Sequence, residues 1–112
     1  DGAAALVIGS RAYGEQHELK PMARILGGAS AGVEPSMMGL GPVPACQKLL
    51  KRLGLTLQQM DIIEVNEAFS AQVLGGLKQL GIAEDDPRIN PNGGAISVGH
   101  PLGASGTDPS SP

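Results

Sequence analysis

Residues 93–106 read Gly-Gly-Ala-Ile-Ser-Val-Gly-His-Pro-Leu-Gly-Ala-Ser-Gly, and this stretch decides how the rest of the chain is interpreted. Five glycines within it allow the backbone to approach a ligand closely. Pro101 restricts the backbone directly after His100. Histidine changes charge near neutral pH, so it suits a base toward a thiol or a donor to a thioester oxygen. His100 is therefore the strongest candidate for a functional residue.

Other interpretations of this loop are possible. His100 could simply be hydrogen-bonded within a tight turn, or the glycines could bind phosphate. The P-loop pattern is absent because no Gly-Lys-Ser/Thr follows, and the glycine spacing does not match a dinucleotide-binding loop. A metal site is not expected, because His17 and His100 have no cysteine or carboxylate at ligand spacing.

A second polar cluster, residues 66–69, reads Asn-Glu-Ala-Phe. Asn66 follows an apolar strand expected over residues 61–65 and precedes a helix expected over 67–80. A purely structural role as the N-cap of that helix would therefore explain it. The alternative is an amide that faces a pocket at the carboxyl end of the strand, where α/β proteins often bind ligands. Glu67 would lie in the first helical turn, where the helix dipole favours its charge.

The remaining pattern alternates strands with helices, which favours an α/β fold with layered elements. The expected strands cover residues 3–9, 22–31, 61–65 and 88–90, and the expected helices cover 10–18, 42–53 and 67–80. Cys46, Leu49, Leu50 and Leu53 form an apolar stripe at helical spacing, which gives Cys46 a packing role instead of a nucleophilic one. Ser10 could cap the first helix, Gly54 and Gly81 are expected to end the second and third in the left-handed conformation, and Thr56 and Gln59 have capping-box spacing. The third helix would bury Phe69, Val73, Leu77 and Leu80. Residues 32–41 are expected to form a loop, and an acidic turn is expected at 84–87.

Composition excludes several classes of function. Net charge is −3 over 112 residues and only Tyr13 and Phe69 are aromatic, so no nucleic-acid partner is expected. No apolar run reaches the length needed to span a membrane. The single cysteine fits a reducing compartment, which predicts a cytoplasmic location. Both ends look cut, and the Pro/Ser tail resembles a linker, so the chain is expected to be a piece of a larger protein.

Taken together, the two motifs resemble the active-site motifs of the thiolases, in order and in separation. Residues 1–5 resemble the last strand of the thiolase N-terminal domain, and residues 38–45 resemble the segment that leads into a helix of the C-terminal domain. The resemblance implies a layered α/β/α/β/α fold. It divides the chain into the end of the N-terminal domain at 1–18, an incomplete C-terminal domain at 19–106, and a tail at 107–112. Ser70 and Ser97 depart from the more usual alanine. Residues after Asp61 look most like bacterial 3-oxoadipyl-CoA or acetyl-CoA acyltransferases.

The resemblance also implies an activity, the transfer of an acyl group between coenzyme A and an acyl-CoA. His100 would activate a cysteine nucleophile and, with a water held by Asn66, form an oxyanion hole. Phe69, Ala68, Met38 and Gly99 would bind the acyl-pantetheine part of the substrate. No cofactor is implied beyond coenzyme A as a substrate, and the parent would be a homodimer or homotetramer.

In the family two cysteines carry the chemistry, and neither has a match in these residues. The chain alone is therefore expected to be inactive. The alternative is a non-catalytic thiolase-like module for dimerisation or coenzyme A binding. A thiolase-like condensing enzyme is a weaker alternative, because such proteins generally carry other residues where the Asn-Glu-Ala-Phe motif stands.

Overall fold

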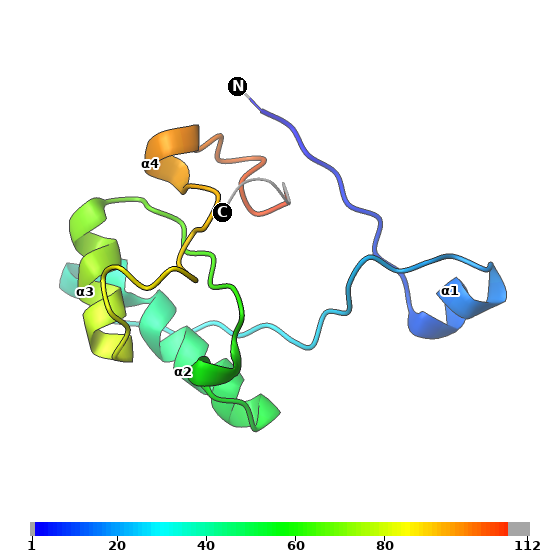
Figure 1. The fold of residues 1–112 in the computed structure, drawn as a ribbon, viewed down its shortest axis with the longest axis horizontal. Coiled ribbons are helices and arrows are strands. Elements are labelled where there is room, and N and C mark those ends of the chain that lie inside the picture. Colours follow the sequence, from blue (N-terminus) through cyan, green and yellow to red (C-terminus); the bar gives the residue numbers. More distant parts are fainter. Residues whose placement is uncertain (1, 108–112) are drawn as a thin grey trace.

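The computed structural model describes residues 2–107, and most of its regular structure is helical (Figure 1). Most of the tail expected at 107–112 lies outside the described residues. The elements are α1 (Arg11–Gln16), the 3-10 helix η1 (Pro35–Leu40), α2 (Pro42–Leu53), the 3-10 turn η2 (Leu57–Gln59), α3 (Ser70–Leu80) and α4 (Ala95–Val98). Helices α2 and α3 pack against each other, and η1 contacts both.

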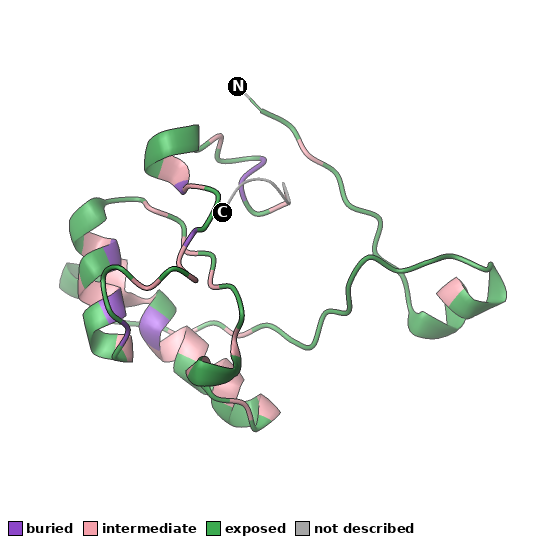
Figure 2. Ribbon diagram, in the orientation of Figure 1, coloured by how far each residue is buried: buried purple, intermediate pink, exposed green. Residues whose placement is uncertain are grey.

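In the N-terminal arm, residues 2–34, the part around α1 projects away from the packed helices, and α1 is the only helix of the arm (Figure 1). Nearly all of it is exposed (Figure 2), including the fully exposed side chain of Val7. The radius of gyration is 15.6 Å, whereas a compact domain of this length has about 13 Å. Ser10 caps α1 as expected, since its Oγ accepts a hydrogen bond from the Tyr13 N–H at 3.1 Å.

The strands expected at 3–9 and 22–31 are extended but do not pair within the described residues, so their assignment to a sheet is wrong for this structure. An extended segment becomes part of a sheet only when a neighbouring strand forms hydrogen bonds with its backbone N–H and C=O groups. Residues 2–107 offer these two segments no such neighbour. Side-chain contacts from α2 hold part of the second segment instead: Arg52 Nη2 donates to the Gly28 carbonyl at 2.7 Å, and Lys48 Nζ donates to the Ser30 carbonyl at 3.2 Å.

Helix α2 agrees closely with the sequence pattern. Pro42 occupies its first turn, and Gly54 ends it in the left-handed conformation with φ of 66°. The expected stripe is half-buried while the four residues between its members are exposed. Loop 32–41 differs from expectation because η1 lies within it, started by Pro35. The capping box of Thr56 and Gln59 is present at η2.

The core is small and centres on α3. Val73, Leu77 and Ile82 form a buried cluster, and Leu77 is only 3% exposed. The partly buried residues packed on this cluster come from the end of α3 and from the segments before and after it: Leu57, Ile63, Val65, Leu80 and Ile89. Gly81 ends α3 in the left-handed conformation, as expected.

The start of α3 differs from the prediction. The helix begins at Ser70 with Phe69 as its N-cap, so Asn66 is not a cap and Glu67 is not in the first turn. Phe69 was also expected to be buried on the helix, but it is 71% exposed. Residues 66–69 instead form an irregular connection between the strand-like segment and α3, which frees the side chains of all four from helical geometry.

One β-bridge places the two motifs in register. Ile63 and Ile89 pair in parallel, with the Ile63 N–H donating to the Arg88 carbonyl at 2.9 Å and the Asn90 N–H donating to the Ile63 carbonyl at 3.1 Å. The strands expected at 61–65 and 88–90 therefore meet, although only in this bridge. Both segments lead directly into the polar motifs, so their pairing brings these motifs to the same side of the core.

Arg88 fastens the turn before this bridge. Its guanidinium donates to both carboxylate oxygens of Asp86, at 2.9 and 2.6 Å, and to the carbonyls of Leu57 and Met60. The hydrogen bonds from Arg88 lower the pKa of Asp86 to about 2. The paired ions hold the acidic turn against η2.

This ion pair predicts an acid-dependent loss of stability. In the unfolded chain the Asp86 carboxyl has its ordinary pKa of 3.8, so it takes up a proton when the pH falls below that value. In the folded chain its pKa is about 2, so the carboxylate stays ionised until about pH 2. The free energy of unfolding should therefore decrease as the pH falls from about 4 to about 2, and Asp86→Asn should flatten this slope. Urea unfolding at a series of pH values measures it. The exposed neighbour Asp85 supplies the control, because Asp85→Asn should leave the slope unchanged.

Candidate active site

The glycine-rich loop contains a helical turn that the sequence did not predict. Helix α4 covers Ala95–Val98, and Gly99 follows with φ of 96°, a conformation that favours glycine. The positive φ redirects the chain directly before His100. The loop therefore presents His100 at a bend instead of along a regular element.

His100 is exposed, and its ring has one buried partner. Its Nδ1 lies 2.7 Å from the Oγ of Ser105, whose side chain is 7% exposed. Ser105 Oγ also donates to the Pro101 carbonyl at 3.3 Å. These contacts fix the Nδ1 edge of the imidazole on the protein side, so the Nε2 edge is the one available for chemistry.

Asn66 is exposed. Glu67, the next residue, links this segment to the glycine-rich loop by hydrogen bonds. Glu67 accepts a hydrogen bond from Asn90 Nδ2 at 3.0 Å through Oε1, and from the Ile96 N–H at 2.9 Å through Oε2. Ile96 lies in α4, four positions before His100. One carboxylate thus joins the segment that carries Asn66 to the segment that leads to His100.

The four expected substrate-binding residues, Phe69, Ala68, Met38 and Gly99, are all exposed, with Phe69 at 71% and Met38 at 75%. Phe69 caps α3 and Met38 lies in η1. These two elements are in contact, because a side chain at Gly39 would collide with Gln72 of α3. Phe69 and Met38 therefore stand on adjoining elements, and both offer exposed apolar surface.

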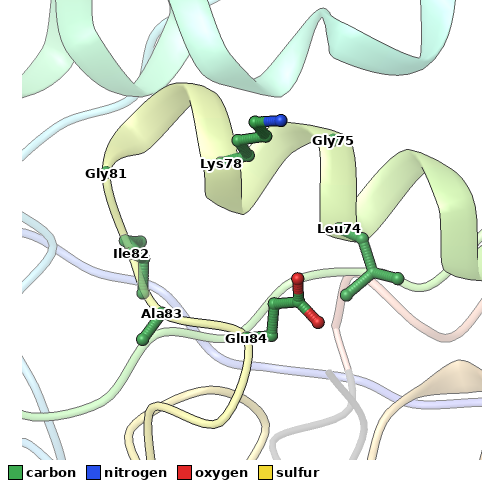
Figure 3. Close-up of a pocket in the computed structure, with 7 residues that line it drawn as sticks. All are labelled: Leu74, Gly75, Lys78, Gly81, Ile82, Ala83 and Glu84. Carbon is green, nitrogen blue, oxygen red and sulfur yellow. The ribbon is translucent and has the colours of Figure 1, made fainter.

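Two hollows lie along α3. The hollow in Figure 3 is lined by Leu74, Gly75, Lys78, Gly81, Ile82, Ala83 and Glu84 at the end of the helix. It contains no residue of either polar motif. A second groove runs from α3 to the glycine-rich loop. It too is lined by none of the six expected site residues, but it includes Glu67 of the Asn-Glu-Ala-Phe motif and Ile96 and Ser97 of the loop, so it adjoins the candidate site.

Other features of the described residues bear on the chemistry. Cys46 is half-buried on α2, and burial raises the pKa of its thiol, which favours the neutral form over a nucleophilic thiolate. No cluster of three or more metal-ligating side chains occurs within residues 2–107. In the same range, no helix has the length and apolar character required to cross a membrane.

Comparison with known proteins identifies the class. Residues 19–109 match the family model of the thiolase C-terminal domain, so the chain belongs to the thiolase family. A solved structure of human mitochondrial 3-ketoacyl-CoA thiolase in complex with CoA aligns with a TM-score of 0.80 and 47% identity, over 86% of this chain and 24% of that one. The predicted fold class is thereby confirmed as that of the thiolases.

Individual thiolases from bacteria are more similar to the chain in sequence. The chain is 59% identical to a β-ketoadipyl-CoA thiolase from Pseudomonas aeruginosa and 58% identical to the 3-oxoadipyl-CoA/3-oxo-5,6-dehydrosuberyl-CoA thiolase of Escherichia coli, each over 106 residues. Each alignment covers 95% of this chain and 26% of the relative, so the chain spans about a quarter of the length of the curated relatives it matches. The resemblance to 3-oxoadipyl-CoA thiolases is confirmed as a similarity of sequence.

Sequence reasoning missed three residues that organise this site: Glu67, Asn90 and Ser105. Glu67 was expected to interact only with the dipole of the helix that follows it, and the other two residues were given no role. Ser105 lies only five residues after His100, so its contact with the ring is local in the sequence. No local pattern could pair Glu67 with Ile96, which lie 29 residues apart.

Proposed function

We propose that the chain is the C-terminal part of a thiolase that transfers an acyl group between coenzyme A and an acyl-CoA, by condensation or by thiolysis of a 3-oxoacyl-CoA. The observation that carries this proposal is the hydrogen bond between Glu67 and the Ile96 N–H. It links the Asn66 motif to the His100 loop, and the family match gives these motifs their setting. Residues 1–18 would then complete the N-terminal domain and 19–106 would belong to the C-terminal domain.

In this proposal His100 takes the proton of a cysteine thiol supplied by another part of the complete enzyme. Its Nε2 then donates to the thioester oxygen, together with a water held by the Asn66 amide. A donor aimed at the developing oxyanion contributes about 3 kcal/mol to the transition state. Phe69, Ala68, Met38 and Gly99 would line the path of the acyl-pantetheine arm. Their exposure and the adjoining elements support this placement.

The proposed substrate is 3-oxoadipyl-CoA, since the bacterial relatives at 58–59% identity are named for it. Coenzyme A is the second substrate, and no further cofactor is proposed. We also propose a homo-oligomer and a cytoplasmic location for the complete enzyme, as in the sequence-based prediction.

A hybrid enzyme tests the proposal. Residues 1–106 replace the matching segment of the Pseudomonas aeruginosa β-ketoadipyl-CoA thiolase, and thiolysis of 3-oxoadipyl-CoA is followed by loss of the 3-oxoacyl-CoA absorbance. We expect the folded hybrid to retain turnover comparable with the bacterial enzyme. A hybrid that folds and binds coenzyme A but has no turnover would contradict the proposal.

The 112-residue chain alone should be inactive. Its only cysteine is Cys46, whose burial on α2 disfavours a thiolate. Purified chain is assayed for thiolysis of acetoacetyl-CoA beside its His100→Ala variant, and the two rates should be the same. Turnover above that of the variant would show that the chain acts alone. Because burial raises the pKa of this thiol and disfavours the thiolate, the isolated polypeptide fits the second candidate, a non-catalytic thiolase-like module.

A further inference from the structure

We propose that Glu67 is a positioning residue that sets the placement of His100 relative to Asn66. The inference rests on the proposed function, because it concerns the geometry of the same site. Glu67 itself need not touch the substrate. It acts through the backbone of α4, which leads into Gly99 and His100.

The contacts of Glu67 divide between two segments that are distant in sequence. Oε2 accepts from the Ile96 N–H at 2.9 Å, one of the N–H groups at the start of α4 that has no partner within that helix. The residue at the N-cap position of α4, Gly94, has no side chain to do this. The carboxylate of Glu67 thus supplies from 29 residues away the cap that α4 lacks.

The second carboxylate oxygen is anchored to the core. Oε1 accepts from Asn90 Nδ2 at 3.0 Å. Asn90 is 9% exposed and adopts a positive φ of 41°. Its amide also donates to the Val65 carbonyl at 2.9 Å and accepts from the Val65 N–H at 2.7 Å. Asn90 therefore holds the residue directly before Asn66 and the carboxylate directly after it.

A carboxylate is required because both of its oxygens accept. In Glu67→Gln one oxygen becomes an NH₂ group, which would face either the Ile96 N–H or the Asn90 NH₂. Two donors cannot bond to each other, so one of the two contacts is lost while the size of the side chain is kept. The variant thereby breaks the bridge that Glu67 forms between Asn90 and Ile96, without creating a cavity.

Gly94 gives an independent way to break the same bridge. A Cβ built at this position would overlap the carboxylate of Glu67. The φ of Gly94 is −112°, which any residue can adopt, so Gly94→Ala acts by displacing Glu67 and not by straining the backbone. Both variants should have the same consequence for His100.

The hybrid enzyme described above provides the test, as a double-mutant cycle. We expect Glu67→Gln to lower kcat by about 10- to 100-fold with a much smaller change in KM, because a displacement of about 1 Å at a catalytic group costs up to about 100-fold. In a His100→Ala background the same substitution should have little further effect, since the group that it positions is gone. Glu64→Gln, an exposed glutamate three residues earlier, is the matched control and should leave both constants unchanged.

Two results would overturn the inference: an unchanged kcat in Glu67→Gln, or an equal loss in both backgrounds, which would indicate general destabilisation. An inactive but folded hybrid would instead count against the proposed function. Amide hydrogen exchange in the 112-residue chain tests this bridge without any activity. Exchange at Ile96 should accelerate in Gly94→Ala, which displaces the whole carboxylate, but not in Glu64→Gln, and equal rates in the two variants would contradict the inference.

Discussion

Replacing His100 with alanine in the hybrid thiolase is expected to lower kcat by about 1,000-fold. General acid–base catalysis by a positioned side chain contributes about 100- to 10,000-fold, and the loss of an oxyanion donor adds to this effect. The structure supports a large effect because Ser105 holds the Nδ1 edge of the ring and a positive φ at Gly99 aims the loop. KM for the acyl-CoA should change little, since the imidazole acts mainly in the transition state.

The other histidine of the chain gives a matched control. His17 stacks on Tyr13 with ring centroids 4.2 Å apart, in the exposed N-terminal arm. His17→Ala should keep kcat within the error of the measurement. If His100→Ala lost no more activity than His17→Ala, the role assigned to the glycine-rich loop would be wrong.

Replacing Leu77 with alanine is expected to cost about 3 kcal/mol of unfolding free energy. Removal of a buried leucine side chain loses its transfer free energy and leaves a cavity, for a total of about 2–5 kcal/mol. Leu77 is 3% exposed and contacts the other members of the small cluster, Val73 and Ile82. Because so few side chains are buried, this loss should remove much of the cooperativity of unfolding.

Urea unfolding of the 112-residue chain, followed by circular dichroism at 222 nm, measures the effect. Leu74 lies one turn earlier on the same helix and is 44% exposed. Leu74→Ala should therefore change the unfolding free energy by about 0.5 kcal/mol or less. Equal costs for the two substitutions would mean that α3 does not carry the core.

The parts of the fold that the sequence predicted are those defined by local chemistry. The stripe on α2, the left-handed glycines at positions 54 and 81, the Ser10 cap and the Thr56–Gln59 capping box all depend on residues within one or two turns. Their periodicity and end signals are visible in the letters themselves. The family resemblance came from motif order, and the comparison with solved thiolases confirmed it.

The parts that could not be predicted depend on distant partners. The segments at 3–9 and 22–31 have strand-like composition, but composition does not supply the neighbouring strand that a ladder requires. The start of α3 was placed three residues too early, because Asn66 is a good cap and Glu67 a good first-turn residue in isolation. The tertiary contacts of Glu67 with Asn90 and Ile96 outweighed that local preference. The roles of His100, Asn66 and the substrate-binding residues stay predictions.

The bond between Glu67 and Ile96 also bears on the order in which the molecule acquires its shape. Bringing together two points 29 residues apart costs about 3 kcal/mol of chain entropy, whereas a helix such as α2 closes only loops of a few residues. Local turns and helices therefore form early, and the two motifs meet only after the core has gathered around α3. The juxtaposition of the two motifs is thus acquired late in folding, and on warming it should be the first contact to be lost.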